Sequence, residues 1–127
     1  MSTNPINLAI RFLLEIAMLI ALGLWGWHLD AGWLRYAAMI VVPLLAATLW
    51  GVFRIQNDPK PAPVEIPGTA RLLLEWALFG LAILALFNTG HFLAGIVMGI
   101  VVKLHYIFSY DRTWAMLRNK PYMGFVK

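Results

Sequence analysis

The sequence predicts an all-α integral membrane protein, a four-helix bundle made of two parallel helical-hairpin repeats. Three observations lead to this fold class: an apolar composition, long stretches without charge, and an arginine–glutamate motif that occurs twice. Of the 127 residues, 61% are hydrophobic and 13% are charged, whereas an ordinary globular domain is about half apolar and about a quarter charged. Too few polar residues remain to cover a core in water, so the composition indicates a lipid environment.

Two uncharged runs are long enough to cross a bilayer. Residues 36–53 carry no charge, and residues 76–102 contain only His91. About 20 apolar residues are needed to span a hydrocarbon core of about 30 Å. The first residues are not typical of a cleavable signal peptide, since Arg11 and Glu15 interrupt the apolar stretch.

The first hairpin repeat is predicted over residues 6–53. Its first helix, over 6–27, follows Asn4-Pro5, and proline suits the first turn of a helix. A short turn leads to the second helix, over 33–53, in which Pro43 predicts a kink.

A proline-rich loop over residues 54–68 separates the two hairpins, because its four prolines and three charges between Gln56 and Gly68 cannot span lipid. The second hairpin repeat, over 69–110, holds helices over 69–87 and 91–110, with Gly90 suited to a left-handed cap. Residues 111–127 form a polar, basic tail. The whole chain is one membrane domain.

The distribution of basic residues predicts the orientation in the membrane. Only Arg35 flanks the side of the two hairpin turns, and Lys103 lies inside a helix. The other eight lie on the side of the termini: Arg11, Arg54, Lys60, Arg71, Arg112, Arg118, Lys120 and Lys127. Positive residues favour the cytoplasmic side, so both termini are expected there.

The repeat is visible when the chain is shifted by 60 residues. RFLLEIA at 11–17 then falls on RLLLEWA at 71–77, with five identities in seven positions. Each hairpin crosses the membrane twice, so the second copy enters in the same orientation as the first. The repeats are therefore parallel and related by an axis along the membrane normal.

Six ionisable residues form the candidate buried ionic site. Glu15 and Glu75 lie at similar depths, and each follows an arginine by four residues on its own helix, Arg11 and Arg71. Lys103 is a third candidate cation, and His105 a further member. Two interpretations stay open: the pairs anchor the helices and hold the hairpins together, or they form a functional site, because ionisable residues inside a membrane often do.

Other features favour packing or exclude whole classes of function. Gly95-x-x-x-Gly99 matches the pattern for close helix approach, within the chain or at a dimer contact. The chain has no cysteine, and no catalytic, metal-binding or nucleotide-binding motif is present. We therefore expect no enzyme activity, no metal and no cofactor. The basic residues cluster at helix ends, which topology explains better than nucleic-acid binding.

Several motifs resemble one family of small membrane proteins. Trp50-Gly51-x-Phe53, the proline-rich segment from Pro59 to Pro63, and Arg71-x-x-x-Glu75 are similar to the YrdB family. Arg11-x-x-x-Glu15 and Leu24-Trp25-Gly26 are similar too, and the resemblance covers about residues 6–105. It implies a four-helix protein of the bacterial inner membrane and brings no activity with it.

Two hypotheses of function follow. The first is a small-solute or ion- and proton-linked transporter that uses the glutamate pair, which would favour a homodimer because four helices barely enclose a pathway. The second is an accessory or structural membrane subunit that binds lipid or a larger protein complex.

Overall fold

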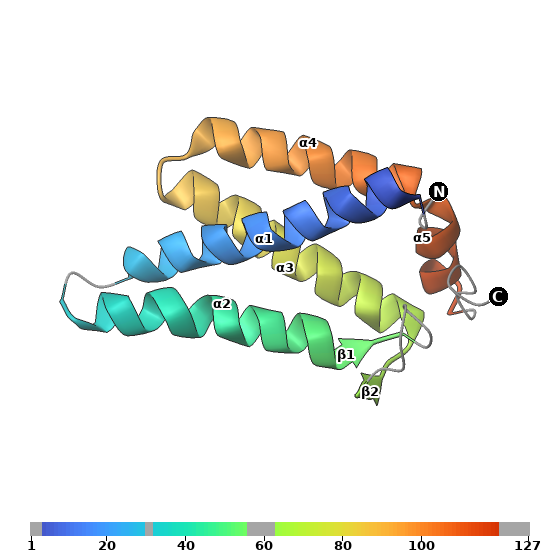
Figure 1. Ribbon diagram of the computed structural model, residues 1–127, viewed down its shortest axis with the longest axis horizontal. Coiled ribbons are helices and arrows are strands. Elements are labelled where there is room, and N and C mark those ends of the chain that lie inside the picture. Colours follow the sequence, from blue (N-terminus) through green and yellow to red (C-terminus); the bar gives the residue numbers. More distant parts are fainter. Residues whose placement is uncertain (1–3, 30–31, 56–62, 120–127) are drawn as a thin grey trace.

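The structure, a computed structural model, describes residues 4–29, 32–55 and 63–119 and is almost entirely helical (Figure 1). The elements over these residues are α1 (Pro5–Trp27), α2 (Leu34–Val52), β1 (Phe53–Arg54), β2 (Val64–Glu65), α3 (Gly68–Asn88), α4 (Phe92–Phe108) and α5 (Tyr110–Leu117). The predicted all-helical class is confirmed. The predicted loop over 54–68 lies partly outside the described residues, and its described ends pair as the two short parallel strands.

Among the described residues, three helices are long and apolar enough to cross a membrane, namely α1, α2 and α3. A fourth span results if α4 and α5, which are bent by 81° at their junction, are taken as one broken span. Many large apolar side chains are exposed, with Ile6 at 73%, Trp33 at 75% and Leu93 at 76%. Soluble monomers rarely expose so much apolar surface, and the surface is that of a membrane protein.

The helix ends follow local sequence signals. Asn4 is the N-cap of α1, its side chain accepts a hydrogen bond from the N–H of Ile6 at 2.9 Å, and Pro5 occupies the first turn. Side-chain capping of this kind satisfies an N–H that has no partner within the helix. Gly90 has φ of +85°, as expected where the chain leaves α3 in a left-handed turn. Both signals were read correctly from the sequence.

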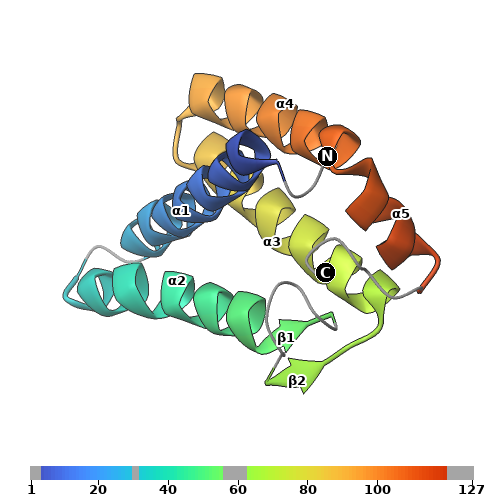
Figure 2. The same ribbon diagram turned by 45° about the vertical axis from the view of Figure 1, so that its right-hand side comes forward.

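Helix α3 is the centre of the structure. In the most apolar 18-residue stretch of α3, 44% of the residues are buried, whereas the corresponding shares are 28% in α1 and 6% in α2. Figures 1 and 2 show α1 running obliquely across α3. The start of α1, the end of α2, the start of α3 and the end of α4 all lie at the same end of the molecule, together with α5 (Figure 1). We call this the N-terminal end.

Helices α1 and α2 touch backbone to backbone. A Cβ atom on Gly26 would lie 2.4 Å from the carbonyl oxygen of Ala38, so only glycine fits there. One turn earlier, Gly23 packs against the carbonyl of Met39 and the ring of Pro43. The N–H that would bond Met39 is missing at Pro43, and α2 continues as a helix through this proline.

The predicted tail needs correction, because its first part is a helix. Helix α4 ends at Phe108 and not at Tyr110, and α5 leaves it at 81°. Among the described residues, three kinds of contact hold α5 and the residues after it on the start of α3. A Cβ on Gly68 would lie 2.6 Å from the Cα of Met116, and the side chain of Asn119 accepts hydrogen bonds from the N–H and hydroxyl of Thr69 at 2.9 and 3.0 Å. The third contact is ionic and belongs to the site described below.

Candidate functional site

A buried ionic cluster at the N-terminal end is centred on Glu75 of α3, whose side chain is 1% exposed. Its Oε2 accepts hydrogen bonds from Arg71 Nε at 2.6 Å and from Arg112 Nη2 at 2.7 Å. Its Oε1 accepts from the Tyr106 hydroxyl at 2.5 Å and from Arg112 Nη1 at 3.0 Å. A carboxylate has about four acceptor positions, so protein donors from α3, α4 and α5 occupy all of them.

Arg112 supplies the third contact between α5 and α3. It approaches Glu75 through two nitrogens, the bidentate geometry that makes arginine–carboxylate pairs strong and directional. The residue is 2% exposed. A charge so well removed from water is stable only with a partner. The ion pair with Glu75 therefore holds α5 in place, and α5 in turn covers Glu75.

Arg71 joins this cluster to the end of α2. Its Nη1 donates to the carbonyl oxygens of Trp50 and Phe53, both at 2.6 Å. The last carbonyls of a helix have no partner within it and carry partial negative charge, so a cation there is favourable. The guanidinium also lies 4.5 Å from the centre of the Trp50 ring, within the range of a cation–π contact.

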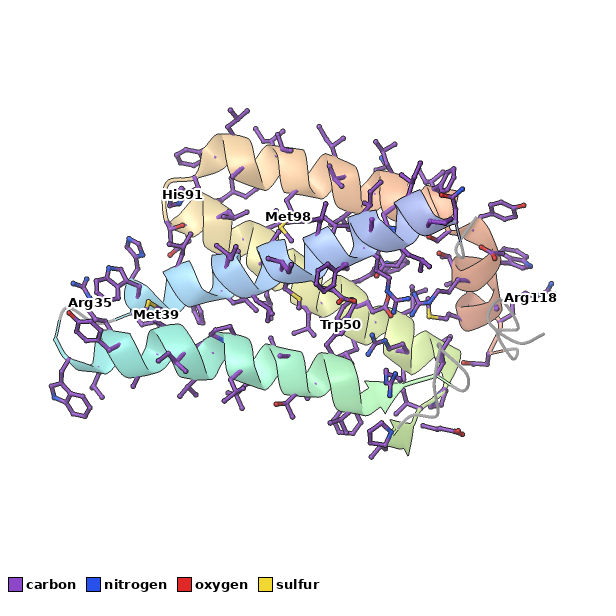
Figure 3. All side chains as sticks on the ribbon, viewed as in Figure 1. Arg35, Met39, Trp50, His91, Met98 and Arg118 are labelled. Atoms are coloured by element: carbon purple, nitrogen blue, oxygen red, sulfur yellow. The ribbon has the colours of Figure 1, made fainter. Side chains whose placement is uncertain are left out.

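Glu15 of α1 lies beside this cluster in a more open environment. Its Oε1 accepts a hydrogen bond from Trp50 Nε1 at 2.8 Å, and Arg11 Nε lies 3.7 Å away. The side chain is 27% exposed. Trp50 therefore connects the two acids, because its ring nitrogen bonds Glu15 and its carbonyl bonds Arg71. Figure 3 shows Trp50 among the side chains enclosed by the helices.

A second polar group lies between α1 and α4. Asn7 Nδ2 donates to Ser109 Oγ at 2.7 Å, and His105 Nδ1 is 3.0 Å from Asn7 Oδ1. All three residues are buried, at 2%, 2% and 5% exposure. Ser109 is the residue at the bend between α4 and α5, so Asn7 of α1 holds this bend from the far side.

The structure thus brings together four of the six predicted site residues: Arg11, Glu15, Arg71 and Glu75. His105 belongs to the neighbouring Asn7 group. Lys103 lies outside both, because its side chain is exposed. Lys103 and His105 are two residues apart on α4, which at about 100° per residue places them on nearly opposite faces of the helix.

The two predicted packing glycines contact side chains of α3 within the same chain. A Cβ on Gly95 would lie 3.2 Å from the ring of Phe87, and one on Gly99 would lie 3.9 Å from Ile83. The close backbone approaches occur elsewhere, at Gly26 and Gly68. Those two glycines carry no partner at the i+4 spacing, so the small-residue pattern could not reveal them.

Sequence reasoning missed several members of the site, and Arg112 is the most important. The sequence carried a signal for a helix there, because the large apolar residues Tyr110, Trp114 and Leu117 follow one another at i, i+4 and i+7. Such a pattern is typical of an amphipathic helix. No comparable signal exists for the other members, Trp50, Tyr106, Asn7 and Ser109. Each is a single polar group in or at the end of an apolar helix, so it forms no repeating pattern along the sequence.

Comparison with known proteins gives one consistent result. A family model described as "Protein of unknown function (DUF2568)" matches residues 9–103. The "Uncharacterized protein YrdB" of Bacillus subtilis (strain 168) is 35% identical over 112 residues, which cover 86% of this chain and 91% of that protein. No solved structure matches the chain. The resemblance predicted from the sequence is confirmed.

Proposed function

The chain belongs to the DUF2568 family of proteins of unknown function, and we propose that it acts as an accessory or structural subunit of the cytoplasmic membrane. In this role it binds lipid or a larger membrane complex and performs no catalysis. One observation carries the proposal: the four acceptor positions of Glu75 are filled by Arg71, Arg112 and Tyr106.

A filled carboxylate is suited to holding helices and poorly suited to transport. A transport site must exchange its partners during each cycle, and binding a solute at Glu75 would first require an arginine to leave. That step would leave a buried charge without its partner, which costs about 3–5 kcal/mol. The same contacts link α3, α4, α5 and the end of α2. The cluster therefore fixes how the membrane helices are arranged.

We also propose that the four long helices form two parallel hairpin repeats with both termini in the cytoplasm. Both arginine–glutamate pairs lie within ion-pair distance on their own helices, at 3.7 Å for Arg11–Glu15 and 2.6 Å for Arg71–Glu75. Both lie at the N-terminal end of the molecule. The two pairs differ in burial, because α5 covers only the second.

Topology reporters test this orientation. Fusions at Pro61 and after the last residue are expected to report the cytoplasm, and a fusion at Gly90 the opposite side, because basic residues are retained on the cytoplasmic side. An external signal from the fusion at Pro61 would contradict the arrangement. The fusion at Gly90 is the internal control, since it must report the opposite side from both others.

Ion- or proton-linked transport is the second candidate function, and the exposure of Glu15 is the observation that favours it. In the part of the chain that the structure describes, Glu15 accepts one hydrogen bond, from Trp50, and Arg11 lies farther away at 3.7 Å. Its side chain is 27% exposed. Such a group can gain or lose a proton without opening the Glu75 cluster. Transport would then use Glu15 alone and not the pair of acids.

Reconstituted vesicles distinguish the two functions. Full-length protein is placed in liposomes that contain a pH-sensitive dye, and the decay of an imposed pH gradient is followed. A structural role predicts that wild type, Glu15→Gln and protein-free liposomes lose the gradient at the same rate. A faster decay with wild type, abolished by Glu15→Gln and retained in the exposed-site control Lys103→Gln, would overturn the structural proposal in favour of transport.

A further inference from the structure

A crevice between α1 and α4 runs from the N-terminal end toward the middle of the molecule. At that end a cavity of about 870 Å³ is lined by Asn7, Ile10, Val101 and His105, among others. A second cavity of about 450 Å³ continues from it and shares Ile10 and Val101 as lining residues. Ligand pockets have volumes of about 300–1,000 Å³, so the crevice has the capacity of a binding site.

The two parts of the crevice differ in polarity. The described lining of the first cavity includes four polar residues, Asn4, Asn7, His105 and Tyr110. Among the described residues, only apolar ones line the second cavity, which reaches Ile20 on α1 and Ala94 on α4. From Asn7 to Ile20 is 13 residues, or about 20 Å at 1.5 Å per residue. A crevice that is polar at one end and apolar for the rest of its length matches a single acyl chain with a small head.

His105 indicates what the head contains. With Asn7 oriented to donate to Ser109, its Oδ1 can only accept, so Nδ1 of His105 donates to it. The Nε2 atom of the neutral ring is then an acceptor. In the described part of the chain the side chain of His105 makes one hydrogen bond, through Nδ1, which leaves Nε2 for a ligand in the cavity that the residue lines. A ligand must donate to this nitrogen, as a hydroxyl group does.

The lining residues also exclude a strongly charged head. No lysine, arginine, aspartate or glutamate lines either cavity in the described part of the chain. Arg11 and Arg112 act on His105 through space, but both already pair with carboxylates, Glu15 and Glu75. A phosphate or carboxylate placed here would therefore lose its water for little countercharge, which is unfavourable in an apolar crevice. An uncharged head that carries a free hydroxyl satisfies both conditions.

We propose that the α1–α4 crevice binds an uncharged, hydroxyl-bearing acyl lipid of the monoacylglycerol type. Its hydroxyl donates to Nε2 of His105, and its acyl chain lies along Ile10, Val101 and the second cavity. This deepens the proposed function, on which it rests, by naming the class of lipid that the accessory subunit holds. The binding is reversible and breaks no covalent bond.

Native mass spectrometry of the full-length protein in detergent tests the proposal with three probes: monooleoylglycerol, methyl oleate and oleic acid. Monooleoylglycerol is expected to bind once per chain. Methyl oleate, which has no hydroxyl to donate to His105, is expected to bind about five- to tenfold more weakly, the usual effect of one hydrogen bond. His105→Phe keeps a ring beside Tyr106 and should reduce the preference for monooleoylglycerol to none. His91→Phe, at the exposed turn on the opposite end, is the matched control.

Filling the crevice gives an independent readout. Val101→Phe places a larger side chain where the two cavities meet, and it should abolish binding of both probes while the protein keeps its helical circular dichroism. Equal binding of monooleoylglycerol and methyl oleate by wild type would overturn the proposal, as would tighter binding of oleic acid. The pH-gradient assay does not depend on this ligand, so loss of lipid binding and failure of the structural role are separate outcomes.

Discussion

Replacing Glu75 by glutamine is expected to lower the free energy of unfolding by about 3–5 kcal/mol, the usual cost of breaking a buried ion pair from one side. Arg71 and Arg112 are 0% and 2% exposed, and both would lose the negative charge that they now share. The free energy of unfolding of a native protein is only about 5–15 kcal/mol, so a loss of this size is a large part of the total. Unfolding of the full-length protein in mixed micelles, followed by circular dichroism, measures the change.

Two further variants separate the ionic cause from general damage. Glu15→Gln is the matched control, because its 27% exposed carboxylate lies 3.7 Å from Arg11 and the glutamine oxygen can still accept from Trp50. A change of about 1 kcal/mol or less is expected there. Combining Glu75→Gln with Arg112→Met should cost less than the sum of the two single changes, since the double variant removes one stranded charge. Equal, small effects at Glu15 and Glu75 would show that the cluster does not hold the helices.

Gly26→Ala is expected to destabilise the α1–α2 hairpin by about 1–3 kcal/mol, in the range of overpacked cores. The added Cβ would lie 2.4 Å from the oxygen and 2.6 Å from the carbon of the Ala38 carbonyl. Both are backbone atoms, so no side-chain rotation can relieve the contact and the two helices must separate. The same micelle unfolding experiment gives the change in free energy.

Gly80→Ala provides the control for this substitution. Nothing lies within 4 Å of a Cβ at Gly80, which sits inside α3. Alanine is the better helix former by about 1 kcal/mol, so this variant should be as stable as wild type or slightly more so. If Gly26→Ala matched Gly80→Ala, the close approach of α1 and α2 would not contribute to stability.

The position of α5 connects these stability arguments to function. Its contacts with α3 run through Gly68, Thr69 and Glu75, and its junction with α4 at Ser109 is bonded to Asn7 of α1. The polar end of the α1–α4 crevice is therefore built on the same contacts that hold α5. A change that releases α5 should also disturb this crevice, whereas Val101→Phe should affect the crevice alone.

The sequence by itself determined the features that depend on neighbours along the chain. Composition indicated lipid, and helix ends followed local signals at Asn4 and Gly90. The arginine–glutamate pairs at four-residue spacing also formed as predicted on their own helices. Each of these requires only the geometry of one helix or one turn, which a short segment of sequence already contains.

Tertiary structure alone decided which partners complete the site. Sequence depth favoured Lys103 as the third cation, but the 81° bend after α4 brings Arg112 to Glu75 and leaves Lys103 on the exposed face. The bend is held by Asn7, 102 residues away along the chain. Likewise, the carbonyls that Arg71 binds belong to the end of another helix. Such contacts depend on how whole helices are placed relative to one another. The sequence does not reveal that placement, because in a chain so rich in apolar residues the faces of each helix are too similar.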